Sequence, residues 1–247
     1  MTEYKRVFSF LLDLAFPPEC IICDQPVGKA NSLCIDCWNG IEFISDPVCD
    51  QCGKPMEYYA DFETHERILC FECLASPSKI YQARAAMIYG ETSKKLLLLL
   101  KYTDRIHLAK ILAPMTLTSA KDIIKTADII IPVPLHPQRL FQRKYNQASM
   151  LAKHIGKLAS VPVLFNTLKR HKNTFAQGNM NKCERDLNVH NAFSIDKQDK
   201  HKIKNRKILL VDDVRTTGST AEECAKVLLK NKAKQVNLLT IARTVSS

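Results

Sequence analysis

Residues 207–223 read KILLVDDVRTTGSTAEE, and this stretch decides the expected fold. Its four aliphatic residues, 208–211, are typical of a buried strand, and they run directly into two adjacent acids, Asp212 and Asp213. A hydroxyl-rich turn through a single glycine follows, and then a helix-forming run in which Ser219 and Glu222 have the spacing of a capping box. The sequence therefore predicts a strand, a turn and a helix in immediate succession.

Two acids beside such a turn indicate a particular ligand chemistry. Ligands of open α/β sheets bind at the carboxyl ends of the strands, where Asp212 and Asp213 are expected. Backbone N–H groups, hydroxyls and the positive end of the following helix suit a phosphate, whereas paired carboxylates accept hydrogen bonds from two vicinal hydroxyls. A ribose 5-phosphate offers both groups. The residues expected to cradle its phosphate are Thr216, Thr217, Gly218, Ser219 and Thr220.

Beyond residue 79, strand-like apolar runs alternate with helix-like spacing. Such alternation is typical of a parallel sheet flanked by helices, so the expected fold class is α/β. The polar stretch 168–189 has no clean periodicity and is expected to be a lid or a binding segment, because long loops are uncommon inside compact domains. The expected strands are 83–90, 127–135, 161–165, 207–213 and 235–245, and the expected helices are 93–105, 108–125, 136–160 and 219–231.

Eight of the ten cysteines fall into four CxxC pairs between residues 20 and 73. A disulfide framework would need an oxidising compartment, and the N-terminus lacks the pattern of a signal peptide. Zinc is the better account, since two such pairs close a structural site of four thiolates. Pairing in chain order closes the shortest loops, and interleaved pairing is the alternative. The expected ligands are Cys20, Cys23, Cys34 and Cys37 for one Zn²⁺, and Cys49, Cys52, Cys70 and Cys73 for the other.

Charge is divided along the chain as unevenly as cysteine. Small polar residues and a proline at 74–79 indicate a linker, so we expect a cysteine-rich domain at 1–78 and the sheet domain at 79–247. The first carries a net charge of −8 and the second +19. A field of that size concentrates polyanions such as nucleic acid, and solubility alone is the competing explanation. Two basic clusters favour the polyanion: Lys169, Arg170, Lys172 and Lys182 in one expected loop, and residues 197–207 in another.

No run of about 20 apolar residues is present, so no segment is expected to span a membrane. Residues 6–16, RVFSFLLDLAF, are expected to form an amphipathic helix that covers the zinc ribbons or the sheet domain, and a membrane-surface anchor is the alternative. The expected location is cytoplasmic, and the anchor would add peripheral association at the inner face of the membrane.

The opening stretch resembles the phosphoribosyl-pyrophosphate motif of type I phosphoribosyltransferases, with four hydrophobic residues, two acids and a TTG-type loop. The resemblance implies that Asp212 and Asp213 hold the ribose hydroxyls and act in catalysis, that Mg²⁺ accompanies the pyrophosphate, and that a mobile hood covers the site. Arg139 and Arg143 are candidate phosphate ligands from their charge, with helix-surface solubility as the alternative. Arg215 would add a further cation beside the anion site.

The whole chain resembles the ComF family of competence-associated proteins, which joins zinc ribbons to a phosphoribosyltransferase domain. The features that carry this resemblance are FPPECIIC, LLLLLKY, IPVPLHPQRLFQRKYNQA, Gln177, ERDLNVHNAF and TIAR. Lys144 stands where the family-like motif is expected to have glycine. The resemblance implies a role in DNA uptake, with single-stranded DNA and an uptake helicase or channel protein as partners, and places Arg185 in or below the hood.

Catalytic turnover stays open at this stage. The sequence shows neither a convincing general base nor an acceptor pocket, so the acceptor of the phosphoribosyl group is unknown. The alternative to a DNA-uptake protein is an active phosphoribosyltransferase of nucleotide metabolism.

Overall fold

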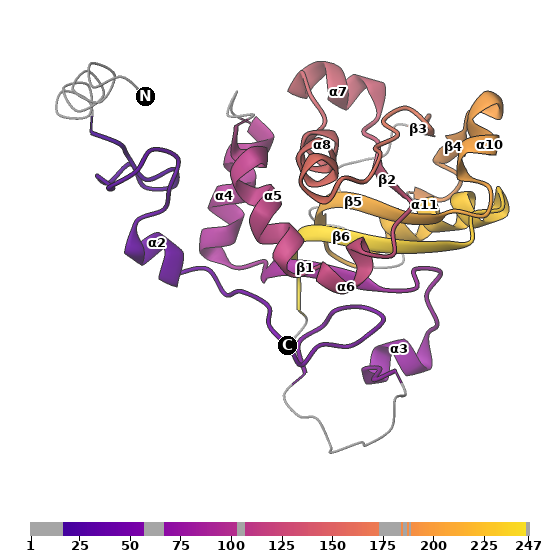
Figure 1. Cartoon of the computed structure of the whole chain (residues 1–247), viewed down its shortest axis with the longest axis horizontal. Coiled ribbons are helices and arrows are strands. Elements are labelled where there is room, and N and C mark those ends of the chain that lie inside the picture. The colour runs from indigo at the N-terminus through magenta and orange to yellow at the C-terminus, as the bar shows by residue number, and fades with distance from the viewer. Residues whose placement is uncertain are drawn as a thin grey trace.

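Four parallel strands form the central sheet of the protein, seen in a computed structural model (Figure 1). The structure describes residues 17–56, 67–102, 107–172, 184, 187 and 189–245. The strand order is β1 (Ala83–Ile88), β6 (Gln235–Arg243), β5 (Lys207–Arg215) and β2 (Ile129–Pro132). The expected α/β class is confirmed, and β5, which carries the two acids, lies inside the sheet.

Helices bury both faces of this sheet because its strands carry apolar residues on both sides. Along β5, Leu209 and Val211 join one apolar cluster, while Ile208 and Leu210 join the other. The helices around the first cluster are α4 (Glu91–Tyr102), α5 (Leu108–Thr118) and α8 (Gln147–Ala159), and α11 (Ser219–Lys230) closes the second. This two-sided burial explains the uninterrupted aliphatic run in front of Asp212.

Two of the expected helices are each divided in two. Residues 108–125 form α5 and α6 (Lys121–Ile124), which are separated by a turn. Residues 136–160 form α7 (Pro137–Arg143) and α8, and the break falls at Lys144, whose φ of 63° is left-handed. Glycine adopts this conformation at least cost, so the backbone here has the shape for which a glycine is expected, although lysine occupies it.

The start of α11 differs from the expected capping box. The N-cap residue is Gly218, and Ser219 is already the first helical residue. Glu222 reaches instead to the segment before β1, where its carboxylate accepts hydrogen bonds from the Ser78 hydroxyl and, at 2.9 Å, from the Lys79 backbone N–H. The acid three residues into the helix therefore anchors the expected linker rather than the helix start.

The segment between β2 and β5 also departs from expectation. Residues 161–165 make one isolated parallel bridge, between Val163 and Ile130, in place of a strand. Leu168–Arg170 forms β3, which pairs antiparallel with β4 (Phe193–Ile195), where a loop is expected. Three residues are too few to show a period, so only the tertiary pairing reveals this strand.

This pairing engages two members of the first expected basic cluster. Lys169 Nζ lies 2.6 Å from Asp196 Oδ2, and Arg170 is buried with its guanidinium carbon 5.4 Å from the centre of the Phe193 ring. Lys172 is exposed, and Lys182 lies outside the described residues. The second basic segment forms η1 (Lys197–Asp199) and α10 (Lys200–Ile203).

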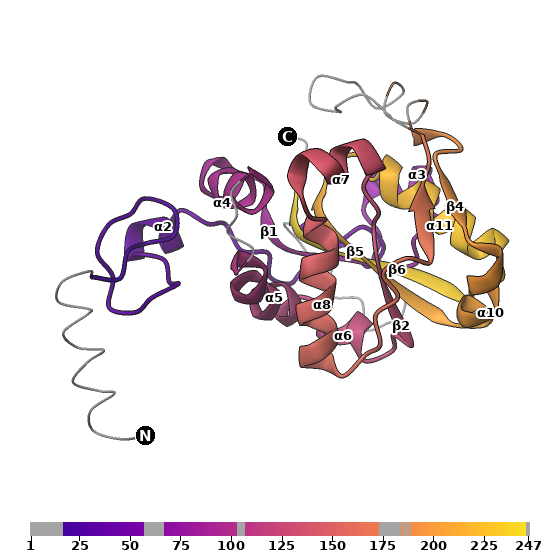
Figure 2. The ribbon, with the colours of Figure 1, turned by 90° about the horizontal axis from the view of Figure 1, so that it is seen from above.

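The cysteine-rich region carries α2 (Ile35–Asn39) and α3 (Phe71–Ala75), and its central part runs beside the edge strand β1. Backbone hydrogen bonds join Ile44 N to Ala86 O at 2.9 Å and Ala83 N to Gln51 O at 2.8 Å. Figure 2 shows the segment with α2 at one end of the molecule, beyond α4 and α5. Hydrogen bonds thus connect the two parts of the chain on either side of residue 78. The domain boundary expected at that residue stays a prediction.

None of the helices in the described part of the chain is long and apolar enough to cross a membrane. The amphipathic helix expected at residues 6–16 lies outside the described residues.

Candidate functional site

Asp212 and Asp213 lie near the carboxyl-terminal end of β5, at the side of the sheet where parallel sheets bind ligands. Both residues are half-buried rather than turned fully into the core. Each carboxylate accepts a hydrogen bond from the next backbone N–H: Asp213 N lies 2.9 Å from Asp212 Oδ1, and Val214 N lies 2.7 Å from Asp213 Oδ1. These bonds fix the orientation of both side chains before any ligand arrives.

Lys101, in the last turn of α4, supplies a cation that the residue pattern does not assign to the site. Its Nζ lies 2.9 Å from Asp213 Oδ2. Burial lowers the pKa of Lys101, but the charges of Asp213 and Asp212 outweigh burial and raise it overall. The signal in the sequence is a lysine that ends the buried leucine run of LLLLLKY, because a charge in that position needs a partner.

The surroundings of Asp212 favour its protonated form. Burial raises the pKa of Asp212 to about 8, the neighbouring Asp213 carboxylate adds to the rise, and Lys101 opposes it. Asp212 therefore keeps a proton near neutral pH and becomes an anion more readily when a cation arrives. Carboxylate oxygens are ligands that Mg²⁺ takes, so this pair fits a Mg²⁺ that enters with a diphosphate.

The turn from β5 into α11 has the backbone that close approach of a phosphate requires. Gly218 has a φ of 85° and places the N-terminus of the 12-residue helix at the turn. The Thr217 and Ser219 hydroxyls lie 2.8 Å apart, so they form one polar surface. Thr216 is exposed, and Thr220 is half-buried. Thr216, Thr217 and Gly218 thus form the turn, and Ser219 and Thr220 begin α11 directly after it.

Arg215, which is expected to add a cation beside the anion site, lies next to Gly218 of the turn and also reaches the second cysteine group. Arg215 Nη1 donates to the Cys52 carbonyl oxygen at 2.9 Å, and Arg243 Nη1, from the end of β6, donates to the same oxygen at 2.6 Å. A side chain at Gly218 would start 3.2 Å from Arg215 Nε. Arg215 therefore supports the turn from beneath and ties it to the second ribbon.

The candidate arginines have different surroundings. Arg143 ends α7, and its Nη1 lies 3.4 Å from Gln147 Oε1. Its positive charge opposes the rise in the pKa of Lys101. Arg139, one turn earlier, acts electrostatically on Arg170 in β3. Arg185 lies outside the described residues, so its role stays a prediction.

The eight cysteines form two groups of four in chain order, and within each group the sulfur atoms lie within 4.8 Å of one another. A tetrahedral zinc with bonds of about 2.3 Å separates its sulfurs by about 3.8 Å. Cys23 Sγ and Cys34 Sγ are 3.6 Å apart, and Cys52 Sγ and Cys70 Sγ are 3.7 Å apart. Both groups therefore fit structural Zn²⁺, and the pairing expected from loop length is the one that the structure adopts.

Hydrogen bonds to sulfur support these sites. Backbone N–H groups point at sulfur in both groups: Cys37 N lies 3.4 Å from Cys34 Sγ, and Cys70 N lies 3.2 Å from Cys49 Sγ. A hydrogen bond with Cys49 and the Arg243 guanidinium, 3.5 Å from Cys52 Sγ, together lower the pKa of Cys52 to about 3 against the effect of burial. Cys52 is thus held as the thiolate that a metal needs.

Known proteins resemble both parts of the chain. Residues 11–75 match the double zinc ribbon domain family. Competence protein F of Haemophilus influenzae is 32% identical over 230 residues, which cover 91% of this chain and 96% of the relative. DNA utilization protein YhgH of Escherichia coli (strain K12) is 27% identical over 238 residues, covering 94% and 100%. The solved purine phosphoribosyltransferase from Pyrococcus horikoshii Ot3 is 15% identical, with a TM-score of 0.34 over 56% of this chain and 86% of that one.

A parallel sheet between helices, joined to two four-cysteine groups, defines an α/β protein with a double zinc ribbon. The chain belongs to the family of competence protein F, since that relative is matched along nearly the whole of both chains. The expected ComF membership is confirmed.

Proposed function

We propose that this chain acts in DNA uptake, binds single-stranded DNA, and binds phosphoribosyl pyrophosphate at the turn between β5 and α11. One observation carries the ligand site: two oriented carboxylates precede a left-handed glycine and a helix N-terminus on the same strand-turn-helix unit. Carboxylates suit vicinal hydroxyls and the helix N-terminus suits a phosphate, so a ribose 5-phosphate satisfies both. The names of the relatives, competence protein F and DNA utilization protein, support the biological role.

Each residue has a distinct role in this proposal. Asp212 and Asp213 accept hydrogen bonds from the ribose hydroxyls, and the turn residues 216–220 hold the 5-phosphate. Lys101 and Arg143 lie where they can neutralise the pyrophosphate, and Arg139 extends this positive surface along α7. Mg²⁺ would neutralise charge on the pyrophosphate when bound, and Asp212 and Asp213 would hold it.

Phosphoribosyl transfer is the alternative outcome at the same site. The fixed orientation of the two acids supports it, because backbone N–H groups hold Asp212 Oδ1 at 2.9 Å and Asp213 Oδ1 at 2.7 Å. Asp212 and Asp213 would then orient the ribose and stabilise the positive charge that develops as pyrophosphate leaves. Release of pyrophosphate in the presence of candidate acceptor bases separates a transferase from a protein that only binds the ligand.

Isothermal titration calorimetry with phosphoribosyl pyrophosphate and Mg²⁺ tests the site. The double variant Asp212→Asn with Asp213→Asn should lose detectable binding, because neither side chain can then ionise as the ligand and its Mg²⁺ enter. Glu91→Gln is the matched control, since it neutralises an exposed acid that pairs with Lys95 on α4, and it should bind like the wild type. Titrations with ribose 5-phosphate and with pyrophosphate alone separate the two halves of the site. Unchanged affinity in the double variant, with wild-type folding, would remove the proposal.

A further inference from the structure

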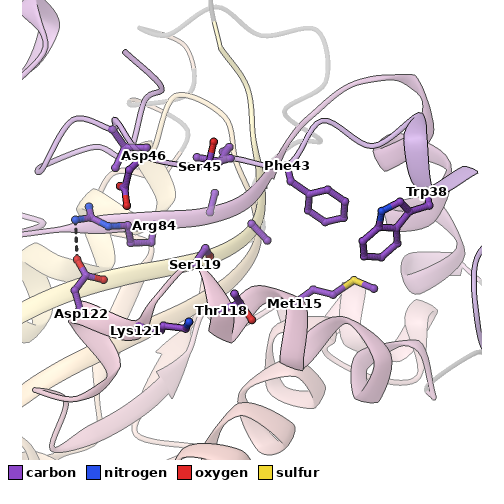
Figure 3. A pocket seen from close by; sticks show the side chains of 15 residues that line it. Trp38, Phe43, Ser45, Asp46, Arg84, Met115, Thr118, Ser119, Lys121 and Asp122 are labelled. Atoms are coloured by element: carbon purple, nitrogen blue, oxygen red, sulfur yellow. Dashed lines mark hydrogen bonds and ion pairs between the residues drawn. The ribbon is translucent and has the colours of Figure 1, made fainter. Parts of the chain in front are cut away.

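A hollow of about 690 Å³ lies between the cysteine-rich region and the sheet domain, away from the turn described above (Figure 3). Its walls come from residues 38–53 on one side, and from β1 and the α5–α6 corner on the other. None of its lining residues belongs to β5 or α11. A ligand in this hollow would therefore be distinct from one at the ribose-phosphate site.

Two aromatic rings form one end of the hollow. Trp38 and Phe43 have ring centroids 4.9 Å apart at 40°, and they remain 46% and 37% exposed. Figure 3 shows Met115 below the two rings, and its thioether adds apolar lining to this end of the hollow. Large aromatic residues gathered at a concave, exposed place indicate a binding surface rather than incomplete packing.

The opposite end of the hollow is polar. Arg84 is held by Asp122 at 2.7 Å and by Asp50 at 3.7 Å, so this guanidinium serves the structure. Lys121 lines the same end and makes no ion pair within the described residues, which leaves its charge at the rim. The Asp46 carboxylate also lines this end and can accept hydrogen bonds from the amino groups of a nucleobase.

A second hollow of about 490 Å³ adjoins the first, because Thr118 and Lys121 line both. It continues past Lys125 to Leu158 at the end of α8. Lys121 and Lys125 are four residues apart along α6 and its cap, a spacing that places their side chains on one face about 6 Å apart. The two hollows therefore form a track with an aromatic platform, two lysines and an apolar end.

We propose that this track binds single-stranded DNA, with a base stacked on Trp38 and Phe43 and successive phosphates on Lys121 and Lys125. The proposal rests on the DNA-binding part of the proposed function and names the place where it occurs. Stacking platforms combined with cationic grooves are the means by which proteins hold single strands without reading sequence, and a duplex cannot present an unstacked base to the rings. The platform is invisible in the sequence because Trp38 and Phe43 belong to the acidic cysteine-rich region, whose charge alone argues against contact with DNA.

Trp38 is the single tryptophan of the chain, so its fluorescence reports this track directly. The experiment titrates the zinc-loaded full chain with a fluorescein-labelled oligothymidylate at low salt, and follows label anisotropy and Trp38 emission together. The proposal expects quenching of Trp38 with the same midpoint as the rise in anisotropy. Phosphoribosyl pyrophosphate with Mg²⁺ should leave Trp38 emission unchanged.

Each other outcome contradicts the proposal in a distinct way. A rise in anisotropy without quenching would remove the track while the proposed DNA binding stands. No rise in anisotropy would remove both. Equal quenching by free dTMP, or by duplex at the same phosphate concentration, would reassign the hollow to a nucleotide or to double-stranded DNA.

Substitutions locate the contacts. Phe43→Leu should weaken single-strand binding about tenfold, because it removes a stacking ring but keeps an apolar side chain. Phe141→Leu is the matched control, since Phe141 is 88% exposed on α7 and outside the track, and it should have no effect. Lys121→Gln should reduce the slope of log affinity against log salt by about 1, and Lys230→Gln, at an exposed position at the end of α11, should not. Equal effects of Phe43→Leu and Phe141→Leu would overturn the track even if both variants fold.

Discussion

The two four-cysteine groups share ligand type and spacing, yet they have different surroundings. In the first group Cys20 is buried but Cys23 is exposed. Ile21, which follows Cys20, belongs to the apolar cluster that α4, α5 and α8 form against the sheet. In the second group Cys49 and Cys52 are both buried, and the Cys52 carbonyl oxygen accepts hydrogen bonds from two arginines of the central sheet. Apolar contact joins the first ribbon to the rest, whereas the second is also held by charged hydrogen bonds.

This difference shows how a metal site becomes part of a domain. A zinc with four thiolates carries a net charge of −2, and Arg215 and Arg243 bring two positive charges to the second site. One of these arginines belongs to the phosphate motif itself. We therefore expect the second zinc to stabilise the phosphate turn, and the first to fold chiefly its own ribbon.

Removing one zinc at a time should give the largest difference in stability between the two cysteine groups. Cys52→Ser and Cys34→Ser should each reduce the zinc content from two ions per chain to one. Cys52→Ser should lower the melting temperature by about 10 °C more than Cys34→Ser does. Loss of the second zinc site also weakens the contacts of this ribbon with the two arginines, which contribute about 3–4 kcal/mol. Metal analysis and thermal melts measure both quantities, and equal shifts in melting temperature would contradict the asymmetry.

A variant of Arg243 removes a contact with Cys52 but keeps all four cysteine ligands, so it tests the contribution of the arginine to the second site separately. Arg243→Met should lower the free energy of unfolding by about 3 kcal/mol, because a buried charged donor to the second site is lost. Arg206→Met, an exposed arginine just before β5, is the control and should change stability little. Urea denaturation gives the values, and faster release of one zinc to a chelator in Arg243→Met alone would identify the weakened site.

The pH dependence of stability gives a smaller effect at the proposed ligand site. The pKa of Asp212 is about 8 in the folded chain, against 3.8 as its ordinary value, so the folded state binds the extra proton. This contribution is complete below about pH 4 and is lost as pH rises toward 8, by at most about 1.4 kcal/mol per pH unit. The wild type should therefore lose stability between pH 6 and pH 7 relative to Asp212→Asn. Parallel pH profiles of the two proteins in urea denaturation would contradict the buried proton.

Local patterns were sufficient for the parts of the molecule that depend on neighbours in sequence. The aliphatic run before Asp212 predicts β5 because both faces of that strand are buried, and the CxxC spacing predicts the zinc groups because each pair must wrap one ion. The turn through Gly218 is likewise local, since its positive φ calls for glycine.

Contacts between distant segments could not be predicted in this way. Arg215 lies next to the phosphate turn in sequence, yet its partner is a carbonyl oxygen 163 residues away. Lys101 on helix α4 reaches Asp213 on strand β5. Trp38 and the α5–α6 corner line the same hollow only after the chain has folded. The short strand β3 and the break at Lys144 were hidden for a related reason, because three residues or one left-handed turn leave no period to detect.

A crystal structure of the zinc-loaded chain with phosphoribosyl pyrophosphate and Mg²⁺ tests the central claim most directly. The account predicts the ribose hydroxyls on Asp212 and Asp213 and the 5-phosphate within the turn 216–220. Density for the ligand elsewhere, or a turn filled by its own side chains at saturating ligand, would contradict it.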